Sequence, residues 1–177
     1  MKGFTRRVRD LDRELFRALF GLKWSPLTAV MRAFSVAGTA GALWGFLAAG
    51  AFLLTGLKPL HLLIPWAAVA ASWTAAEGAK YLFDRARPFI WDTEIAPLTK
   101  TPSSSSFPSG HSATAAAGAL TLSVLYPPFA PAFVLAGALV ILSRVYLGVH
   151  FPFDVLAGVI IGTATAGVVL AGAGLVA

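Results

Sequence analysis

Residues 143–154, SRVYLGVHFPFD, decide how the chain is organised, because they place an arginine, a histidine and an aspartate in an otherwise apolar run. A charged residue at the middle of a membrane costs roughly 2.5–3.5 kcal/mol, so these side chains need compensation. The stretch reads as the end of one helix, a turn at Pro152 and the start of the next. Asp154 can then orient the ring of His150, while Arg144 faces the same cavity. A neutral imidazole held in this way can attack phosphorus, and a guanidinium can hold phosphoryl oxygens.

The composition is typical of a membrane protein. Of the 177 residues, 57% are hydrophobic and 12% are charged, and the mean hydropathy is +0.75. Soluble domains carry about 25% charged residues. The apolar residues form blocks long enough to cross a bilayer core, which takes about 20 helical residues. We therefore expect a single membrane-embedded domain over residues 1–177.

The charges are unevenly distributed, and the chain has no cysteine. Its net charge is +6, and eight of the fourteen Lys and Arg residues lie within the first 32 positions. This distribution fits an anionic lipid surface better than nucleic acid, so membrane lipids and no nucleic acid are the expected partners. Without cysteine, the chain can form no disulfide, zinc–thiolate site or thiol nucleophile.

An amphipathic helix is predicted at the N-terminus, within residues 1–24. Its apolar positions are Phe4, Val8, Leu11, Leu15 and Leu19, with arginines between them. This spacing is typical of a helix that lies on a membrane surface. A cleavable signal peptide needs an uninterrupted apolar core, which the recurring arginines exclude. Removing the helix is therefore expected to weaken membrane anchoring more than chemistry.

An all-α transmembrane bundle is predicted for the rest of the chain. The five candidate spans are residues 35–57, 62–83, 112–126, 129–149 and 155–177. The third is short for a span and needs residues 109–111 as its first turn. A short helix that starts at Pro26 adds a sixth span if it also crosses. Glycine pairs such as Gly158 with Gly162 indicate close helix packing, within or between chains, and so predict no oligomeric state.

A polar segment, residues 84–107, interrupts the apolar blocks and ends in four serines. Loops of this length usually have a function, so we interpret it as a loop over the site, with a plain flexible linker as the alternative. The chain leaves the membrane before this loop, re-enters after it, crosses and then returns. Both ends of the loop and residues 144–154 are therefore expected on the same side of the membrane. Three polar clusters, distant in sequence, are therefore expected to meet at one face.

The residue types in these clusters suit the binding of a phosphate group. Ser109 and Gly110 at a helix start offer backbone amides, a hydroxyl and the positive end of the helix dipole. Lys80 adds a point charge, and Arg87 and Arg144 add planar forks that match phosphate oxygens in pairs. The region lacks the clustered carboxylates that magnesium usually takes, so neither a metal nor another cofactor is expected.

These residues resemble the three-part signature of the type 2 phosphatidic-acid phosphatase superfamily, which includes membrane lipid phosphate phosphatases, undecaprenyl pyrophosphate phosphatases and soluble vanadium haloperoxidases. The first part, K-x6-R-P, is matched by Lys80 and Arg87-Pro88. The second, P-S-G-H, is residues 108–111, and the third, S-R-x5-H-x3-D, is residues 143–154. The resemblance covers about residues 72–160, and every signature position is filled.

The resemblance implies a metal-independent, two-step hydrolysis. His150 is similar to the family nucleophile, which forms a phosphohistidine, and Asp154 to its orienting partner. His111 resembles the general acid that protonates the leaving oxygen and then activates water. The phosphate-binding positions correspond to Lys80, Arg87, Ser109, Gly110 and Arg144.

A site at the membrane boundary favours a lipid phosphate, because the headgroup can reach the cations while the tail stays in hydrocarbon. Polyprenyl phosphates or diphosphates, phosphatidic acid and phosphatidylglycerol phosphate all fit, and Trp91 is a candidate for the lipid entrance. Two alternatives stay open: a lipid phosphotransferase with an acceptor other than water, and a non-enzymatic headgroup binder. The expected location is a bacterial inner membrane. The positive-inside rule favours a site that faces the cytoplasm, unless residues 15–34 also cross.

Other polar residues have plainer interpretations. Glu77 is expected to pair with Lys80, three residues later on the same helix. Asp84 and Arg85 occupy free positions of the signature and are interpreted as salt-bridging or loop-positioning residues. His61 lies outside the clusters, so no catalytic role is expected for it.

Overall fold

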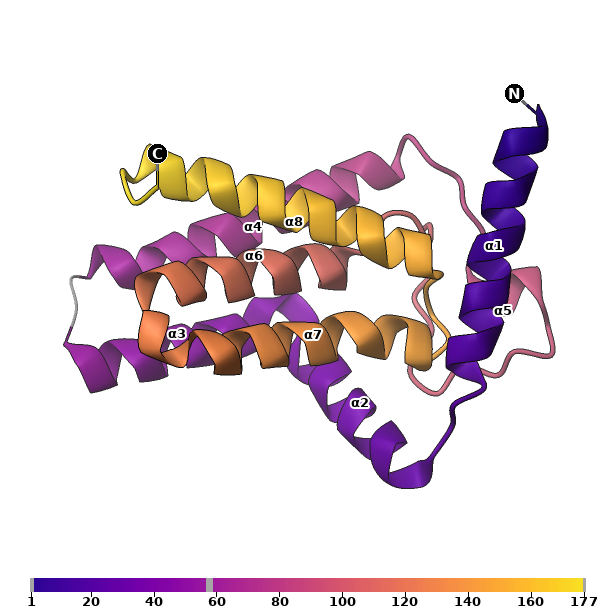
Figure 1. The fold of residues 1–177 in the computed structure, drawn as a ribbon, viewed down its shortest axis with the longest axis horizontal. Helices are drawn as coiled ribbons and strands as arrows, with labels where there is room; N and C mark the ends of the chain where they lie inside the picture. Colours follow the sequence, from indigo (N-terminus) through magenta and orange to yellow (C-terminus); the bar gives the residue numbers. More distant parts are fainter. Residues whose placement is uncertain (1, 57–58, 177) are drawn as a thin grey trace.

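The computed structural model describes residues 2–56 and 59–176, and within these ranges every regular element is a helix (Figure 1). The longer helices are α1 (Lys2–Phe20), α2 (Ser25–Ala37), α3 (Ala42–Thr55), α4 (Leu60–Lys80), α6 (Gly110–Leu125), α7 (Ala130–Tyr146) and α8 (Pro152–Gly172). The short ones are η1 (Thr39–Gly41), α5 (Pro88–Trp91) and η2 (Pro127–Phe129). The all-α prediction is confirmed. Leu57 and Ala177, the predicted ends of two spans, lie outside the described residues.

Helix α6 is the centre of the bundle and packs against α4, α7 and α8. Its alanines and glycines let the neighbouring helices approach closely. A methyl group added at Gly158 or Gly162 of α8 would collide with the backbone of Ser109 or Ala113. The prediction of close packing at these glycines is therefore confirmed.

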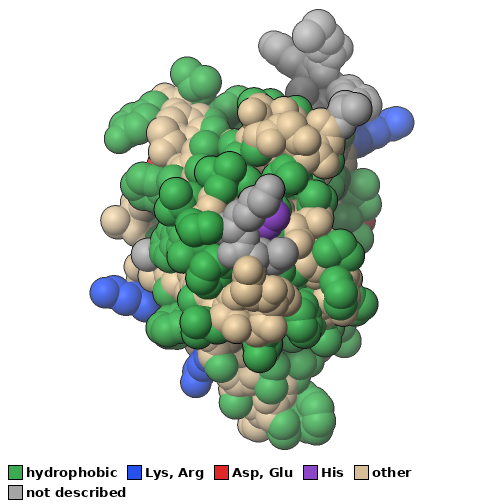
Figure 2. All heavy atoms as spheres, turned by 90° about the vertical axis from the view of Figure 1, so that its left-hand side faces the viewer, with side chains coloured by type: hydrophobic (Ala, Val, Ile, Leu, Met, Phe, Trp, Pro, Cys, Tyr) green, Lys and Arg blue, Asp and Glu red, His purple; other side chains and the backbone are tan. Residues whose placement is uncertain are grey.

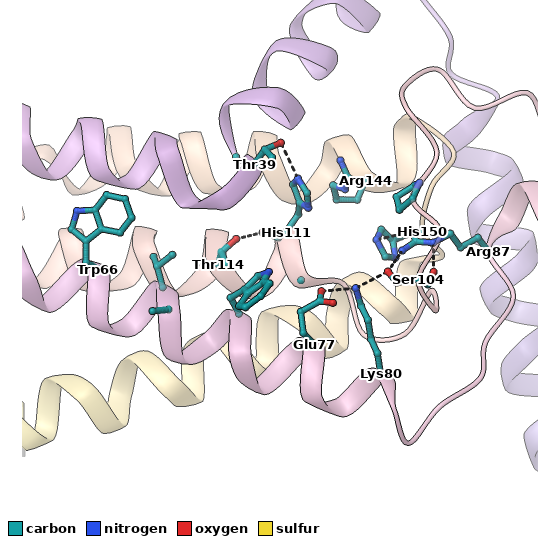
Figure 3. Close-up of a pocket in the computed structure, with 16 residues that line it drawn as sticks. Thr39, Trp66, Glu77, Lys80, Arg87, Ser104, His111, Thr114, Arg144 and His150 are labelled. Carbon is teal, nitrogen blue, oxygen red and sulfur yellow. Dashed lines mark hydrogen bonds and ion pairs between the residues drawn. The ribbon is translucent and has the colours of Figure 1, made fainter.

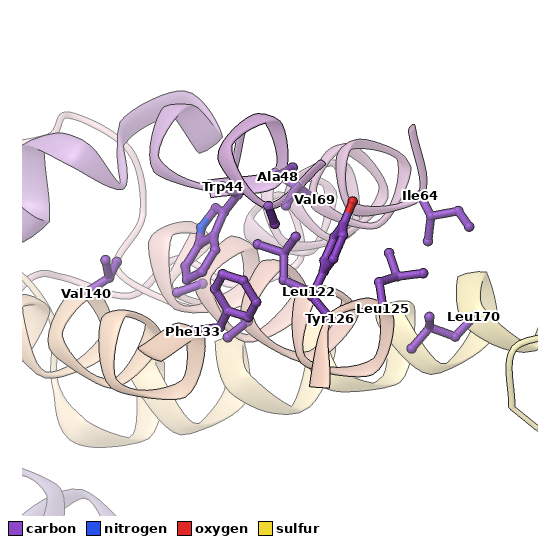
Figure 4. Packing of buried hydrophobic residues seen from close by; sticks show 13 residues of the cluster. Trp44, Ala48, Ile64, Val69, Leu122, Leu125, Tyr126, Phe133, Val140 and Leu170 are labelled. Atoms are coloured by element: carbon purple, nitrogen blue, oxygen red, sulfur yellow. The ribbon is translucent and has the colours of Figure 1, made fainter. Parts of the chain in front are cut away.

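An apolar core fills the part of the bundle away from α1 and holds α3, α4, α6, α7 and α8 together (Figure 4). The indole of Trp44, 1% exposed, lies over Gly118, where no side chain would fit beside it. Leu122, Tyr126 and Phe133 continue this core, and each is at most 4% exposed. Inside a lipid bilayer such side chains stabilise a bundle through close van der Waals contacts, because no transfer out of water is involved.

The outside of the bundle is also apolar. Figure 2 shows hydrophobic side chains over most of the face opposite α1. Large apolar residues with more than half of their surface exposed continue along the helices, including Phe46, Leu53, Leu135, Ile160 and Val168. A surface of this kind suits a lipid environment.

Two helical segments in the described part of the chain are long and apolar enough to cross a membrane, Pro127–Tyr146 and Pro152–Gly172. A third is added if α2 and α3, which are bent by 80° relative to each other, form one broken span. Helix α6 has only 16 residues, and most of them are buried by its neighbours. The prediction of five spans is therefore not confirmed by length and composition.

The predicted continuous span over residues 35–57 is wrong, because α2 and α3 are separated by η1. Gly41 has a φ of +73°, in the left-handed region that glycine adopts without strain, and it redirects the chain. A side chain at Gly38 would collide with Val140 of α7. The break lets α2 leave the bundle and cross its polar end, where Ser35 approaches the predicted site.

Helix α1 also crosses the polar end, in contact with α7 and α8 (Figure 1). The face that packs on the protein carries Asp12 and Phe16, both 0% exposed. The Phe16 ring stacks on Phe20 at a centroid distance of 5.3 Å and meets Phe151 edge-on at 5.4 Å. Leu11, Leu15 and Leu19, which belong to the predicted apolar face, are 48%, 40% and 39% exposed. This face is available to lipid, while the adjacent side of the helix, about 100° away, holds it on the bundle.

Candidate active site

A cavity of about 580 Å³ lies where α4 ends, α6 begins and the turn between α7 and α8 returns (Figure 3). Six of the eight predicted site residues line it: Lys80, Arg87, Gly110, His111, Arg144 and His150. They come from three helices and two connecting segments. The structure thus brings together side chains that are distant in the sequence, such as Lys80 and His150, which are 70 positions apart.

Ser109 and Asp154 do not line the cavity. The Ser109 amide donates to the carbonyl oxygen of Asp154 at 3.0 Å. The Ser109 hydroxyl oxygen accepts a hydrogen bond from the hydroxyl of Ser112 at 2.9 Å and caps α6. In the structure these groups join α6 to itself and to α8, and a role of Ser109 in binding phosphate stays a prediction.

His150 lies between a carboxylate and a guanidinium. Its Nδ1 is 3.6 Å from Asp154 Oδ2, and its Nε2 is 3.2 Å from Arg87 Nη1. If Arg87 donates to Nε2, the ring proton belongs on Nδ1, toward Asp154. Burial lowers the pKa of His150 to about 4, with Asp154 opposing the shift and Arg87 and Arg144 adding to it. The ring is therefore neutral at physiological pH, as a nucleophile requires.

Asp154 is fixed by several donors at the start of α8. Its Oδ2 accepts from the hydroxyl of Ser106 at 2.6 Å and from the amide of Phe151 at 2.9 Å. Its Oδ1 accepts from Arg85 Nη1 at 2.7 Å. A helix N-terminus also favours a carboxylate. These donors fix the position of the Asp154 carboxylate behind His150 and compensate for its complete burial.

Arg87 is held mostly by backbone carbonyls. Its Nε donates to the carbonyl of Ser104 at 2.8 Å, its Nη1 to that of Val149 at 2.8 Å and its Nη2 to that of Ser105 at 3.1 Å. Burial lowers its pKa to about 10, so the guanidinium stays charged at physiological pH. These contacts fix the edge that faces His150, and they tie the serine run to the cavity.

Arg144 is only 3% exposed and is held by α2. Its Nη1 donates to the hydroxyl of Ser35, which the break after α2 brings into reach. Its Nε is buried without a hydrogen-bond partner among the described residues. A buried donor of this kind is costly unless it is satisfied, and an anion in the cavity would satisfy it.

Lys80 and His111 complete the polar part of the cavity. Lys80 Nζ is 2.6 Å from Glu77 Oε1, which confirms the predicted ion pair, and 3.2 Å from the hydroxyl of Ser104. His111 lies in the first turn of α6, with Nε2 3.5 Å from the hydroxyl of Thr39. Arg144 and His150 line the same cavity as His111.

The rest of the cavity is apolar. Trp66, Val69, Ala70 and Trp73 of α4 line it, and Figure 3 shows Trp66 at the opposite end from Arg87. Trp91, the candidate for the lipid entrance, does not line this cavity. Trp91 packs against Phe151 at a centroid distance of 5.9 Å and lies under the guanidinium of Arg13.

Residues 61–174 match the profile of the PAP2 superfamily. The chain belongs to this superfamily. This confirms the resemblance that the three motifs carry. Within the described residues, no three His, Asp or Glu side chains cluster in a way that could hold a metal ion.

Several phosphatases are similar to this chain in sequence. An undecaprenyl-diphosphatase from Sulfolobus acidocaldarius is 38% identical over 88 residues, which are 49% of this chain and 43% of that protein. A lipid A 1-phosphatase from Rhizobium johnstonii is 34% identical over 98 residues, 53% of this chain and 40% of the relative. A decaprenylphosphoryl-5-phosphoribose phosphatase from Mycolicibacterium smegmatis is 37% identical over 127 residues, 72% of this chain and 68% of the relative. The chain thus spans about two fifths of the length of the first two.

Two solved PAP2-type structures have the same fold. Aquifex aeolicus LpxE superposes with a TM-score of 0.78 at 26% identity, covering 91% of this chain and 95% of the other. A PAP2 type phosphatidylglycerolphosphate phosphatase from Bacillus subtilis gives a TM-score of 0.73 at 27% identity, covering 97% and 88%.

Three contributors to the site were not predicted from the sequence. Ser35 and Thr39 come from the break between α2 and α3, which the apolar pattern did not reveal. Ser106 is one of four consecutive serines, and nothing in the run singles it out. Arg85 was interpreted as salt-bridging, which is confirmed, but its partners, Asp12 and Asp154, were not foreseen.

Proposed function

We propose that the protein is an integral membrane phosphatase that hydrolyses a phosphate monoester or diphosphate of a lipid, through a metal-independent phosphohistidine. The observation that carries the proposal is the composition of one cavity. Three cations and two histidines line one part, and tryptophans and aliphatic side chains line the other. A phosphorylated headgroup fits the first part and its hydrocarbon chain the second.

In the first step, Nε2 of His150 attacks phosphorus, and the bond from phosphorus to the leaving oxygen breaks. Asp154 stabilises the positive charge that develops on the ring. Arg87, Arg144 and Lys80 hold the phosphoryl oxygens, and the start of α6 at Gly110 adds the positive end of its dipole. Once the negatively charged phosphate lies beside it, His111 carries a proton, which it gives to the leaving oxygen.

In the second step, the now neutral His111 removes a proton from water, and the resulting oxygen attacks the phosphohistidine. The bond from phosphorus to Nε2 breaks, and His150 returns to the neutral form. Inorganic phosphate and a dephosphorylated lipid are the products. Ser109 acts by capping α6 and by joining it to α8.

The substrate class follows from the apolar wall. Polyprenyl phosphates or diphosphates, phosphatidic acid and phosphatidylglycerol phosphate all combine an anionic headgroup with a long chain. Relatives named as phosphatases of undecaprenyl and decaprenyl compounds support the polyprenyl members of this group. Trp66 and Trp73 would contact the chain next to the headgroup.

We further propose that α3, α4, α6, α7 and α8 cross a bacterial inner membrane, with α1 on its surface and residues 84–107 over the site. The exposed apolar residues on these helices support the crossings. Leu11, Leu15 and Leu19 supply an apolar face for α1, and its arginines suit anionic headgroups. The basic N-terminus favours a site on the cytoplasmic side.

The experiment is a phosphate-release assay on the purified protein with a panel of lipid monophosphates and diphosphates, in EDTA, with and without vanadate. Release that persists in EDTA and is inhibited by vanadate is expected. Loss of the lipid phosphate only after an acceptor alcohol is added, with the phosphate recovered on that alcohol and not as inorganic phosphate, would favour a phosphotransferase. Binding of the lipids without release from any of them would favour a headgroup binder. Activity lost in EDTA and restored by magnesium would contradict the metal-free mechanism.

A further inference from the structure

Asp12 of α1 reaches the back of the candidate active site. Its side chain is 0% exposed, and its Oδ1 accepts from the amide of Phe153 at 2.9 Å. Its Oδ2 accepts from Nη2 of Arg85. Burial raises the pKa of Asp12, and the two hydrogen bonds oppose this shift. An anchoring helix needs no buried carboxylate, so this contact requires a different explanation.

Arg85 connects two carboxylates from opposite ends of the chain. Nη2 binds Asp12, and Nη1 binds Oδ1 of Asp154 at 2.7 Å. The guanidinium also lies 4.6 Å from the centre of the Phe151 ring, and the Arg85 amide donates to the hydroxyl of Ser105 at 3.2 Å. Arg85 is therefore held by α1, by the polar loop and by α8 together.

Arg85 divides its hydrogen bonds between the two carboxylates, and this determines which oxygen of Asp154 faces His150. An arginine that faces a single carboxylate pairs with both of its oxygens. Here Asp12 occupies one nitrogen of the guanidinium, so Arg85 takes only Oδ1 of Asp154. Oδ2 accepts from Ser106 and from the Phe151 amide and stays on the side of His150, 3.6 Å from Nδ1, which has no other hydrogen-bond partner among the described residues.

We infer that Asp12 and Arg85 are positioning residues for the hydrolysis, which hold Asp154 against His150 and set the charge behind its ring. The inference rests on the proposed function for its catalytic meaning. It gives α1 a second role besides membrane anchoring, because docking of α1 completes the hydrogen bonds around the carboxylate. Asp12 and Arg85 touch neither substrate nor the reacting atoms.

The charges predict opposite effects for two substitutions. Asp12, Arg85 and Asp154 together carry a net charge of about −1 behind His150. Asp12→Asn removes a negative charge, which destabilises the protonated ring and lowers the pKa of His150. Arg85→Gln removes the cation next to Asp154, which raises that pKa. The other charged or titratable groups that face the ring, Arg87, Arg144 and His111, are the same in both variants.

The test is the pKa of His150, measured by NMR on ring-labelled protein in detergent, and it needs no turnover. The chain has three histidines, so a His150→Gln sample assigns the signal. We expect Arg85→Gln to raise the pKa by about one unit and Asp12→Asn to lower it by about half a unit. The matched control is Arg17→Gln, which breaks a second ion pair of α1, with Asp92 at 3.5 Å, and leaves the pKa unchanged.

Kinetics on dioctanoyl phosphatidic acid in detergent micelles give the second readout. Both positioning variants should lower kcat about tenfold with KM within about twofold, because Asp154 acts on the ring and not on substrate binding. Arg85→Lys covers the case in which Arg85→Gln does not fold. It retains the charge, so the pKa stays near that of the wild type while kcat falls, since an ammonium lacks the fork that joins both carboxylates.

The pKa shifts and the kinetics separate the two proposals. If the two variants shift the pKa in opposite directions but the wild-type protein releases no phosphate, the result would support the positioning network and contradict the proposed function. If the wild-type protein is active but the pKa of His150 is unchanged in both variants, or shifts in the same direction in both, the positioning network would be overturned and the function left intact.

Discussion

The two ends of the bundle are built in different ways. Away from α1, the side chains pack into an apolar core that includes Trp44, Leu122, Tyr126 and Phe133. At the end with the cavity, turns and loop segments are joined by ion pairs and hydrogen bonds, many of which link residues more than 60 positions apart. The comparison indicates that the apolar end provides most of the stability and the polar end provides the chemistry. Substitutions at the two ends should therefore separate stability from turnover.

The largest expected effect is loss of turnover in His150→Ala. The variant has no nucleophile, so kcat should fall by about 10⁴-fold or more. Lipid phosphate should still bind, because Arg87, Arg144 and Lys80 remain. Phosphate release and equilibrium binding on the same sample check both points. A variant that keeps a tenth of the activity would rule out His150 as the nucleophile.

At the other end, Phe133→Ala should affect stability rather than chemistry. The ring is 4% exposed, and its removal leaves a void that costs about 3–5 kcal/mol. Thermal unfolding in detergent should show a lower midpoint, while kcat per folded molecule stays within about twofold of the wild type. A large fall in kcat without a change in the midpoint would contradict the division between the two ends.

Arg144→Lys should have an intermediate effect. Lysine keeps the charge but lacks the planar fork, and kcat/KM should fall about a hundredfold. Ser35→Ala is the matched control, since it removes only the hydroxyl that accepts from Arg144. Its loss should be about tenfold, because a hydrogen bond from a charged group contributes about 1.5 kcal/mol or more, while the guanidinium and its charge remain. Equal losses in the two variants would show that Arg144 acts only through its position.

The pH dependence should identify the protonation state of His150. Since burial lowers its pKa to about 4, the neutral ring predominates above that value, and protonation removes the nucleophile below it. The contribution of His150 to kcat/KM should therefore be constant from about pH 5 upward and fall about tenfold per unit below pH 4. In His150→Gln the residual rate should lack this limb. A limb near the ordinary histidine pKa, about 6.5, that is also absent from the variant would mean that the ring is not desolvated.

The smallest effect is expected at Trp66, in the apolar part of the cavity. Trp66→Ala should raise KM for a long-chain lipid phosphate about tenfold and leave KM for a short-chain one nearly unchanged, because only the long chain reaches this wall. Comparison of chain lengths within one variant supplies the control. An equal rise for both substrates would place the hydrocarbon chain elsewhere.

The sequence predicted the two ends unequally well. The apolar blocks indicated helices, and the spacing of charged residues brought Lys80, His111 and His150 toward one place, because few residues of these types occur in apolar spans without a function. The pairing of Asp12 with Arg85 was not predictable, since it depends on which face of α1 meets the bundle. The break at Gly41 was missed because Ser35 and Thr39 are too few to interrupt the apolar pattern, and the bend depends on contacts with other helices.

The most direct test of the central claim is to trap the covalent intermediate. Protein quenched in alkali during turnover, where phosphohistidine is stable, would be digested and analysed by mass spectrometry. The account predicts one phosphate on the peptide that contains His150, formed in EDTA and absent from His150→Ala. Turnover without a phosphorylated peptide, or phosphate on a different residue, would contradict it.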